Sequence, residues 1–226
     1  MGAVSLQNLS SFTLLESPTK VKSLAENAKK KGYSAIALTD VNITYGLVDF
    51  YRAAKDIGIK PLLGMQLRIN GLIDGANKYD LIVIAKDDQG YRNILRLSSA
   101  VNLLTENGEK ENVLTLEDLK KYLGHLILIT PSNLHSELKM LQTNNPKMGA
   151  NYLRKAQDLL PSSSSMYLGV YADSGQQEYI NYIRSLATQF NLPLTAVEDG
   201  QYLNRNEQFL RRTLQAIKTN THLENI

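Results

Sequence analysis

Residues 32–64 read GYSAIALTDVNITYGLVDFYRAAKDIGIKPLLG, and this stretch decides the fold class. Ala35–Leu38 is a short, continuously apolar run, which is typical of a strand covered on both faces. Residues 45–57 have the apolar spacing of an amphipathic helix, which Gly58 closes. Residues 60–69 follow as a second strand. This strand–helix–strand order is typical of an α/β protein.

The alternation extends along the whole chain. We expect strands over residues 4–9, 35–38, 60–69, 80–85, 125–130, 166–171 and 192–197. We expect helices over residues 20–31 (with Thr19 as the N-cap), 45–57, 89–104, 115–122 (with Thr115 as the N-cap), 134–141, 149–159, 176–190 and 206–218. Residues 71–78 are expected to form a turn, and residues 105–112 and 161–165 to form loops.

Seven strands alternating with helices predict a parallel α/β sheet covered on both faces. A closed barrel and an open doubly wound sheet both fit this pattern, and periodicity does not separate them. In either fold a site lies at the carboxyl ends of the strands. Three of these ends fall at residues 39–41, 66–68 and 85–87.

Composition excludes several classes of protein. The chain has 226 residues, of which 43% are hydrophobic and 21% charged, so most of it is expected to fold. It has no cysteine, which excludes a disulfide scaffold and a cysteine-ligated zinc site. A net charge of +3 does not indicate a nucleic-acid-coating domain. There is neither a secretory signal nor an apolar run of membrane-spanning length, so we expect a cytoplasmic protein.

Common catalytic motifs are absent, including the phosphate loop, G-x-G-x-x-G, G-x-S-x-G and H-E-x-x-H. The three histidines, His125, His135 and His222, are isolated, and we expect structural or surface roles for them. The basic triplet at 29–31 ends a predicted helix, where cations favour the helix dipole. We give the basic pairs at 120–121 and 211–212 a similar structural interpretation, although Arg211 and Arg212 could instead face a neighbouring domain.

Several stretches, in order, resemble the PHP (polymerase and histidinol phosphatase) domain of bacterial DNA polymerase III alpha subunits. Residues 6–17 resemble its opening motif, L-H-x-H-S-x-Y-S-L-L-D-G, and residues 32–46 its T-D-H motif. Residues 58–64 resemble G-I-K-P-I-x-G, and residues 81–97 resemble L-L-A-K-x-x-x-G-Y-x-N-L. Residues 196–203 resemble A-T-N-D-V-H-Y-L, and residues 214–220 resemble the closing helix.

The resemblance implies a distorted seven-stranded β/α barrel, similar to a TIM barrel, as a single PHP domain over residues 1–226. It implies an N-terminal fragment of a much longer C-family replicative polymerase, and the end of the chain just after a helix favours a fragment. In many relatives such a barrel binds about three metal ions and acts as a 3′–5′ exonuclease. The catalytic aspartates of nucleotidyl transfer would lie beyond residue 226.

The family's histidine ligands fall on other residue types here. They correspond to Gln7, Leu9, Val41, Asp80 and Gln201. An amide oxygen is a weaker donor to zinc or manganese than an imidazole, and leucine and valine donate nothing. Residues 7 and 9 are two apart on an expected strand, so one face would lose both nitrogen ligands.

The family's carboxylate ligands are partly kept. Asp40 and Asp199 are retained, the aspartate of the first motif becomes Glu16, and a glutamate becomes Gln66. One further ligand position, expected near residues 130–133, does not align. The remaining carboxylates would hold at most a weakly bound Mg²⁺. We therefore expect no catalytic residue and no cofactor in this domain, although the parent polymerase would use Mg²⁺.

Two interpretations of the remaining polar residues stay open. Glu16, Asp40 and Asp80 could be helix-start or surface carboxylates with no shared site. Alternatively, Gln7, Gln66 and Gln201 donate hydrogen bonds to Asp199 and its neighbours, which would stabilise carboxylates that have lost their cations.

Three functions follow from these interpretations. The first is a structural and interaction module of the polymerase alpha chain, which contacts other domains of that chain, an exonuclease subunit or other replisome proteins. DNA would be reached through the parent chain. The second is a metal-dependent 3′–5′ exonuclease or phosphoesterase. The third, a free-standing histidinol-phosphate-type phosphatase, fits the resemblance of residues 81–97 and 214–220 less well. The sequence favours the first.

Overall fold

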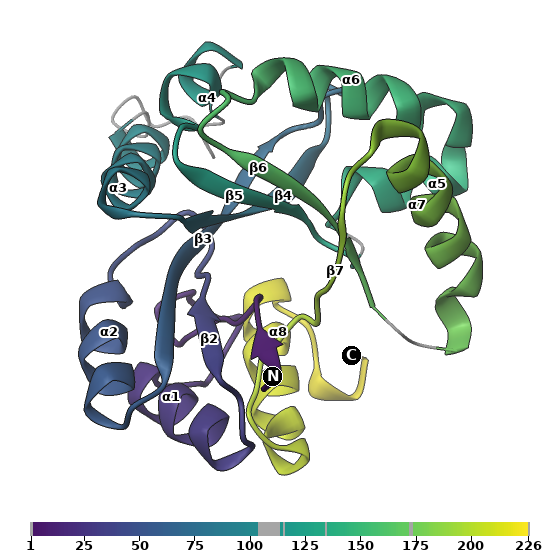
Figure 1. Cartoon of the computed structure of the whole chain (residues 1–226). Helices are drawn as coiled ribbons and strands as arrows, with labels where there is room; N and C mark the ends of the chain where they lie inside the picture. Colours follow the sequence, from purple (N-terminus) through teal and green to yellow (C-terminus); the bar gives the residue numbers. More distant parts are fainter. Residues whose placement is uncertain (1, 104–113, 115, 134, 172–173, 226) are drawn as a thin grey trace. The chain divides into compact units, whose positions relative to one another are not determined.

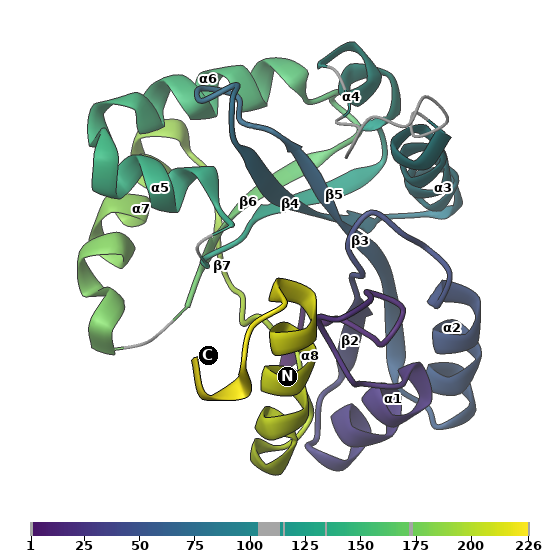
Figure 2. The ribbon, with the colours of Figure 1, turned by 180° about the vertical axis from the view of Figure 1, so that it is seen from behind.

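The computed structural model describes residues 2–103, 114, 116–133, 135–171 and 174–225. The chain forms two compact units (Figures 1 and 2). Unit 1 contains the residues up to 65 and those from 198 onward, and unit 2 contains residues 66–197. Hydrogen bonds link seven strands in chain order from β1 to β7, the number that the sequence predicts. The prediction of one domain over residues 1–226 stays a prediction.

Unit 1 is built on parallel strands. Strand β1 (Val4–Ser5) pairs with β2 (Ala35–Leu38), and β2 pairs with the first half of β3 (Lys60–Asn70). All four residues of β2 are buried, as its continuous apolar run predicts. Strand β1 is shorter than predicted, but an isolated parallel bridge between Asn8 and Gly200 extends the pairing along the chain.

Helices α1 (Val21–Lys30) and α2 (Leu47–Asp56) of unit 1 pack against each other beside β2 and β3 (Figure 1). Gly32 and Gly58 follow them with φ angles of 79° and 68°, the left-handed conformation that glycine adopts without strain. The predicted N-cap at Thr19 is wrong, because Lys20 occupies the N-cap position and α1 begins at Val21. The third helix of unit 1, α8 (Gln208–Thr219), follows the 3₁₀ turn Arg205–Glu207.

Unit 2 contains β4 (Lys78–Ala85), β5 (Leu126–Thr130), β6 (Ser165–Val170) and β7 (Leu194–Ala196). Strands β5, β6 and β7 are parallel, but β4 runs antiparallel to β5. The prediction of an all-parallel sheet is therefore wrong at β4. This reversal places Ala85, the last residue of β4, opposite Leu126, the first residue of β5.

The helices of unit 2 are α3 (Asp88–Leu103), α4 (Leu116–Tyr122), α5 (Glu137–Asn144), α6 (Gly149–Leu159) and α7 (Gln177–Phe190). Helices α5, α6 and α7 pack on one another (Figure 2). The predicted loop 105–112 and the predicted N-cap Thr115 lie outside the described residues. None of the described helices is long and apolar enough to cross a membrane.

The connection between β3 and β4 is held by a buried carboxylate. Glu137, at the start of α5, is 4% exposed and accepts hydrogen bonds from three successive backbone amides. These are the amides of Leu72 at 2.6 Å, Ile73 at 2.7 Å and Asp74 at 2.9 Å. Hydrogen bonds to an ionised acceptor are stronger than those between neutral groups, so Glu137 fixes the path of this turn.

Candidate functional site

The opening motif of unit 1 is folded around the carboxylate of Asp40, which is only 2% exposed. The carboxylate accepts hydrogen bonds from the backbone amide and hydroxyl of Ser10 and from the hydroxyl of Thr13, each at 2.7 Å. The Thr13 hydroxyl also accepts a hydrogen bond from the backbone amide of Val41 at 3.1 Å. Segment 10–13 therefore supplies Asp40 with three neutral donors.

Burial raises the pKa of the Asp40 carboxyl above its ordinary value, and the hydrogen bonds from Ser10 and Thr13 oppose that rise. The cause is that burial penalises the charged form, while donors aimed at the oxygens favour it. Asp40 is therefore a structural anchor for the opening motif, and the interpretation of it as a surface carboxylate is wrong.

Residues 199–201 lie beside the opening motif. The amide of Leu9 donates to the carbonyl of Gly200, and the amide of Gly200 donates to the carbonyl of Gln7, each at 3.0 Å. A Cβ atom at position 200 would lie 2.5 Å from Asn8 Oδ1 and 3.0 Å from the carbonyl oxygen of Gln7, so this close approach favours glycine. Gln7 and Leu9 are both buried here, 1% and 2% exposed. The two ends of unit 1 are thus joined at candidate positions.

The glutamine hypothesis is confirmed for Gln201. Its Nε2 donates to Asp199 Oδ2 at 2.6 Å, and its Oε1 accepts a hydrogen bond from Nε of Arg211. Arginine can only donate hydrogen bonds, so this contact fixes which end of the Gln201 amide faces the carboxylate. Gln7 and Gln66 are buried, with polar contacts of their own, and their part of the hypothesis stays a prediction.

The two remaining acids each bind a cationic side chain. In unit 1, Glu16 forms an ion pair with Lys218 of α8. In unit 2, Asp80 has a side chain only 2% exposed and forms a two-point ion pair with Arg68. Its oxygens lie 2.8 Å from Arg68 Nε and 3.0 Å from Arg68 Nη2. Asp80 is therefore a buried, paired acid, so its interpretation as a surface carboxylate is also wrong.

The partners of these acids were not predicted from the sequence; they are Ser10, Thr13, Arg68 and Lys218. Ser10 and Thr13 were visible as hydroxyl side chains inside the opening motif, and Arg68 as a cation two residues after Gln66. Lys218 is 202 positions from Glu16, so no local signal could have paired them. Near the unaligned ligand position, the buried hydroxyl of Thr130 accepts a hydrogen bond from the amide of Gly169 at 3.0 Å.

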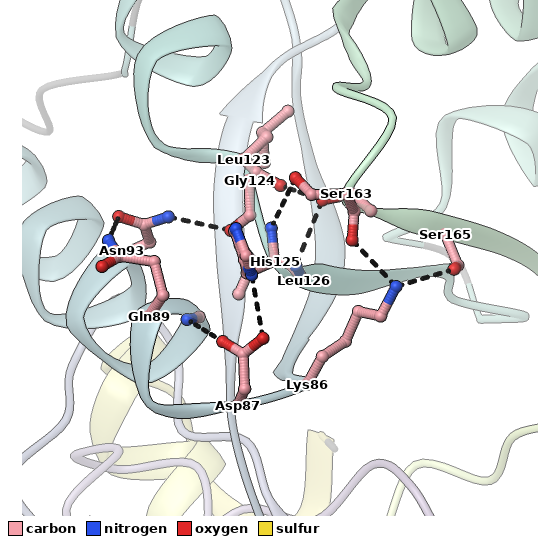
Figure 3. A network of polar contacts seen from close by, with 12 residues as sticks. Lys86, Asp87, Gln89, Asn93, Leu123, Gly124, His125, Leu126, Ser163 and Ser165 are labelled. Atoms are coloured by element: carbon pink, nitrogen blue, oxygen red, sulfur yellow. Dashed lines mark hydrogen bonds and ion pairs between the residues drawn. The ribbon is translucent and has the colours of Figure 1, made fainter.

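The prediction that residues 85–87 lie at the site edge is wrong, because the antiparallel β4 ends beside the start of β5 (Figure 3). There Asp87 contacts His125. The Nδ1 of His125 lies 2.8 Å from Asp87 Oδ2, and both side chains are about half exposed, 43% and 51%. The other oxygen of Asp87 accepts a hydrogen bond from the amide of Gly90 at 2.9 Å, in the first turn of α3. That bond, followed by the contact with His125, lowers the pKa of Asp87.

Lys86 extends this network across to β6 (Figure 3). Its ammonium donates to the carbonyl of Ser163 at 2.8 Å and lies 3.3 Å from the hydroxyl of Ser165. The Ser163 hydroxyl in turn accepts a hydrogen bond from the backbone amide of His125. The network ties the start of α3 to the starts of β5 and β6, which agrees with the structural or surface role predicted for His125.

The comparisons with known proteins identify the family. The PHP domain model matches residues 5–172, which include the opening motif, Asp40 and Asp80. The chain belongs to the PHP domain family. It is 30% identical over 227 aligned residues to the DNA polymerase III subunit alpha of Halalkalibacterium halodurans, covering 100% of this chain and 20% of that protein. The alpha subunit of Bacillus subtilis is 29% identical over 99% of this chain and 20% of that protein. The chain thus spans about a fifth of the length of these relatives.

Two solved structures share the fold. A protein of Bifidobacterium adolescentis that is named as a metal-dependent phosphoesterase superposes with a TM-score of 0.57 at 13% identity. An amidohydrolase of Chromobacterium violaceum superposes with a TM-score of 0.58 at 12% identity. Each likeness covers 88% of this chain and 87% of the other. The predicted fold class, a distorted seven-stranded β/α barrel of the PHP type, is confirmed.

The PHP family implies a metal cluster, and the residues present here do not fit one. Among the nine candidate positions there is no imidazole, and two of them, Leu9 and Val41, carry no donor atom in the side chain. Arg68 and Lys218 pair with the acids at two further positions. Within the described residues, the structure brings together no group of three or more His, Cys, Asp or Glu side chains that could hold a metal ion.

Proposed function

We propose that this PHP domain is a structural and interaction module of a DNA polymerase III alpha chain and carries no metal-dependent catalysis of its own. The observation that carries the proposal is the pairing of the acids at the candidate positions with protein donors. Asp40 is held by hydroxyls and an amide, Asp80 by Arg68, Glu16 by Lys218 and Asp199 by Gln201.

Burial determines what these carboxylates need in order to be stable. A buried carboxylate needs a cation or several donors, because an isolated charge in the interior is strongly unfavourable. In a metal centre the ions supply this compensation. Here side chains of the chain itself supply it, and a metal ion would have to displace Arg68 and Lys218 before it could bind the oxygens they face.

The proposed role of the domain is to bind other parts of the same polymerase. Its relatives are alpha subunits about five times its length, so we expect further domains of that chain as its main partners. Helix α8 offers a surface for them, because Phe209, Leu210 and Ile217 are 61%, 50% and 60% exposed. Large apolar side chains gathered on one helix favour protein contact. We further propose that an exonuclease subunit and other replisome proteins are additional partners. We also propose that the domain is located in the cytoplasm.

Metal analysis tests the proposal that the domain carries no metal-dependent catalysis. The 226-residue chain is purified without chelator, incubated with Zn²⁺ or Mn²⁺, desalted and measured by mass spectrometry of its metals. We expect far less than one equivalent per chain and no chelator-sensitive release of nucleotides from a DNA 3′ end. Near-stoichiometric metal together with such release would establish the alternative, a 3′–5′ exonuclease.

Hydrogen exchange tests the proposal that α8 binds other domains of the alpha chain. Amide exchange in α8 is compared between the 226-residue chain and the full alpha chain encoded by the source gene. We expect α8 to be more protected in the full chain, while α1 serves as an internal reference. Equal exchange of α8 in both would count against α8 as the docking surface.

A further inference from the structure

Helix α8 directs two cationic side chains toward candidate positions of unit 1. Arg211 and Lys218 are seven residues apart, which is close to two helical turns, so they lie on the same face of the helix. Lys218 forms an ion pair with Glu16, and Arg211 donates to Gln201. One face of a single helix therefore contacts both the opening motif and residues 199–201.

The contact of Arg211 extends one residue further, to Asp199. The amide of Gln201 accepts from the guanidinium with its oxygen and donates to Asp199 Oδ2 with its nitrogen, at 2.6 Å. A hydrogen bond from a charged donor polarises the amide and strengthens its own donation. Arg211 in this way strengthens the hydrogen bond that Gln201 donates to Asp199.

Apolar burial contributes little to the position of α8. Of its twelve residues only Ala216 is buried. Leu214 is half-buried, and Phe209, Leu210 and Ile217 are exposed. Helices in proteins are stabilised mainly by packing of an apolar face, and that source is weak here. The polar contacts of Arg211 and Lys218 must therefore account for much of the attachment of α8.

We propose that α8 is a cationic latch, in which Lys218 pairs with Glu16 and Arg211 contacts Asp199 through Gln201, and that these contacts attach the helix to unit 1 in place of a metal cluster. This inference rests on the proposed function, because it assumes that metal ions do not occupy these acids. As a consequence, the attachment of α8 depends on the charges of Glu16 and Asp199. The same helix presents the exposed apolar side chains Phe209, Leu210 and Ile217.

A double-mutant cycle tests the latch in the 226-residue chain. Lys218→Met, Glu16→Gln and the double variant are unfolded in urea at low salt and again in 1 M NaCl. We expect a coupling between Lys218 and Glu16 of about twofold to fivefold in the unfolding constant at low salt, the range of partly exposed ion pairs. The coupling should disappear in 1 M NaCl, where charges are screened within about 3 Å.

The control is Lys22→Met on α1, which removes the same charge from a side chain that is 79% exposed and lies 4.0 Å from Glu26. We expect it to leave stability unchanged. Zero coupling between Lys218 and Glu16 at low salt, or an equal effect of Lys22→Met, would overturn the latch.

Hydrogen exchange of the variant with both Lys218→Met and Arg211→Met provides a second, independent readout. Amides 208–219 should exchange faster than in the unmodified chain, while α1 keeps its protection. Unchanged exchange in α8 would refute the latch even if global stability fell. Metal analysis bears on the proposed function alone, whereas the cycle and the exchange measurement bear on the helix contact, so the two failures are distinguishable.

Discussion

Replacing Arg68 by methionine should strongly destabilise unit 2, because it leaves a buried carboxylate without its cation. The Asp80 side chain is 2% exposed, and both of its oxygens face the guanidinium, at 2.8 and 3.0 Å. The Arg68 side chain is 22% exposed, so the guanidinium itself retains some contact with water. Removing Arg68 therefore leaves a buried carboxylate without its cation, whereas removing Asp80 leaves a guanidinium that water still reaches.

The expected magnitude follows from this asymmetry. Removing one partner of a buried ion pair costs about 3–5 kcal/mol, and we expect about 3 kcal/mol for Arg68→Met because the pair is partly hydrated. Replacing both partners by apolar residues, as in Arg68→Met with Asp80→Leu, removes the uncompensated charge. That double variant should lie within about 1 kcal/mol of the unmodified chain, since such exchanges are often neutral or stabilising.

Urea unfolding of the purified variants measures these free energies. Arg92→Met, which removes an exposed arginine from α3, is the matched control and should change stability by less than about 0.5 kcal/mol. Either of two results would refute the reasoning. The first is a cost of Arg68→Met below about 1 kcal/mol, and the second is a double variant as unstable as the single one.

Three further perturbations concern other buried or paired carboxylates. Glu137→Gln should cost about 2 kcal/mol in urea unfolding, because its NH₂ group would face one of the backbone amides of residues 72–74 that now donate to the carboxylate. For Asp40, the raised folded pKa means that the native state binds a proton more readily than the unfolded state. Stability should therefore fall as the pH rises from 3.8 through the folded pKa, and Asp40→Asn should abolish this slope in urea midpoints measured against pH. For Asp87 the folded pKa is depressed, so its stabilisation is present above the unfolded pKa and is lost as the pH falls through the folded one. Asp87→Asn should lower the melting temperature at neutral pH, and this difference should vanish in acid; an equal loss at both pH values would contradict it.

The elements of the fold were largely predictable, because their cause is local. The apolar spacing of residues 149–159 predicted α6 at the limits that it has, and Gly32 and Gly58 marked the ends of α1 and α2. The direction of a strand has no such local cause, since an apolar run reads the same in a parallel and an antiparallel neighbour. The orientation of β4 was therefore wrong.

For the candidate site, the sequence predicted which metal ligands are missing and one of the contacts that replace them. Residue types alone revealed the absent imidazoles, and the chemistry of amides predicted the donation from Gln201 to Asp199. The cations could not be placed from the sequence, because Arg211 is 10 positions from Gln201 and Lys218 is 202 positions from Glu16. The burial of Asp40 and Asp80 likewise depends on tertiary packing rather than on neighbours in sequence.

The pairing of Arg68 with Asp80 has an evolutionary consequence. A lineage that began to regain a metal centre at this position would first have to remove the arginine, and that step alone would leave a buried charge unpaired. Introducing an imidazole in place of Asp80 first would instead set a second cation against the guanidinium whenever the ring was protonated. Each single change is thus expected to lower stability before the next could restore it, and the pair stabilises the present state of the domain.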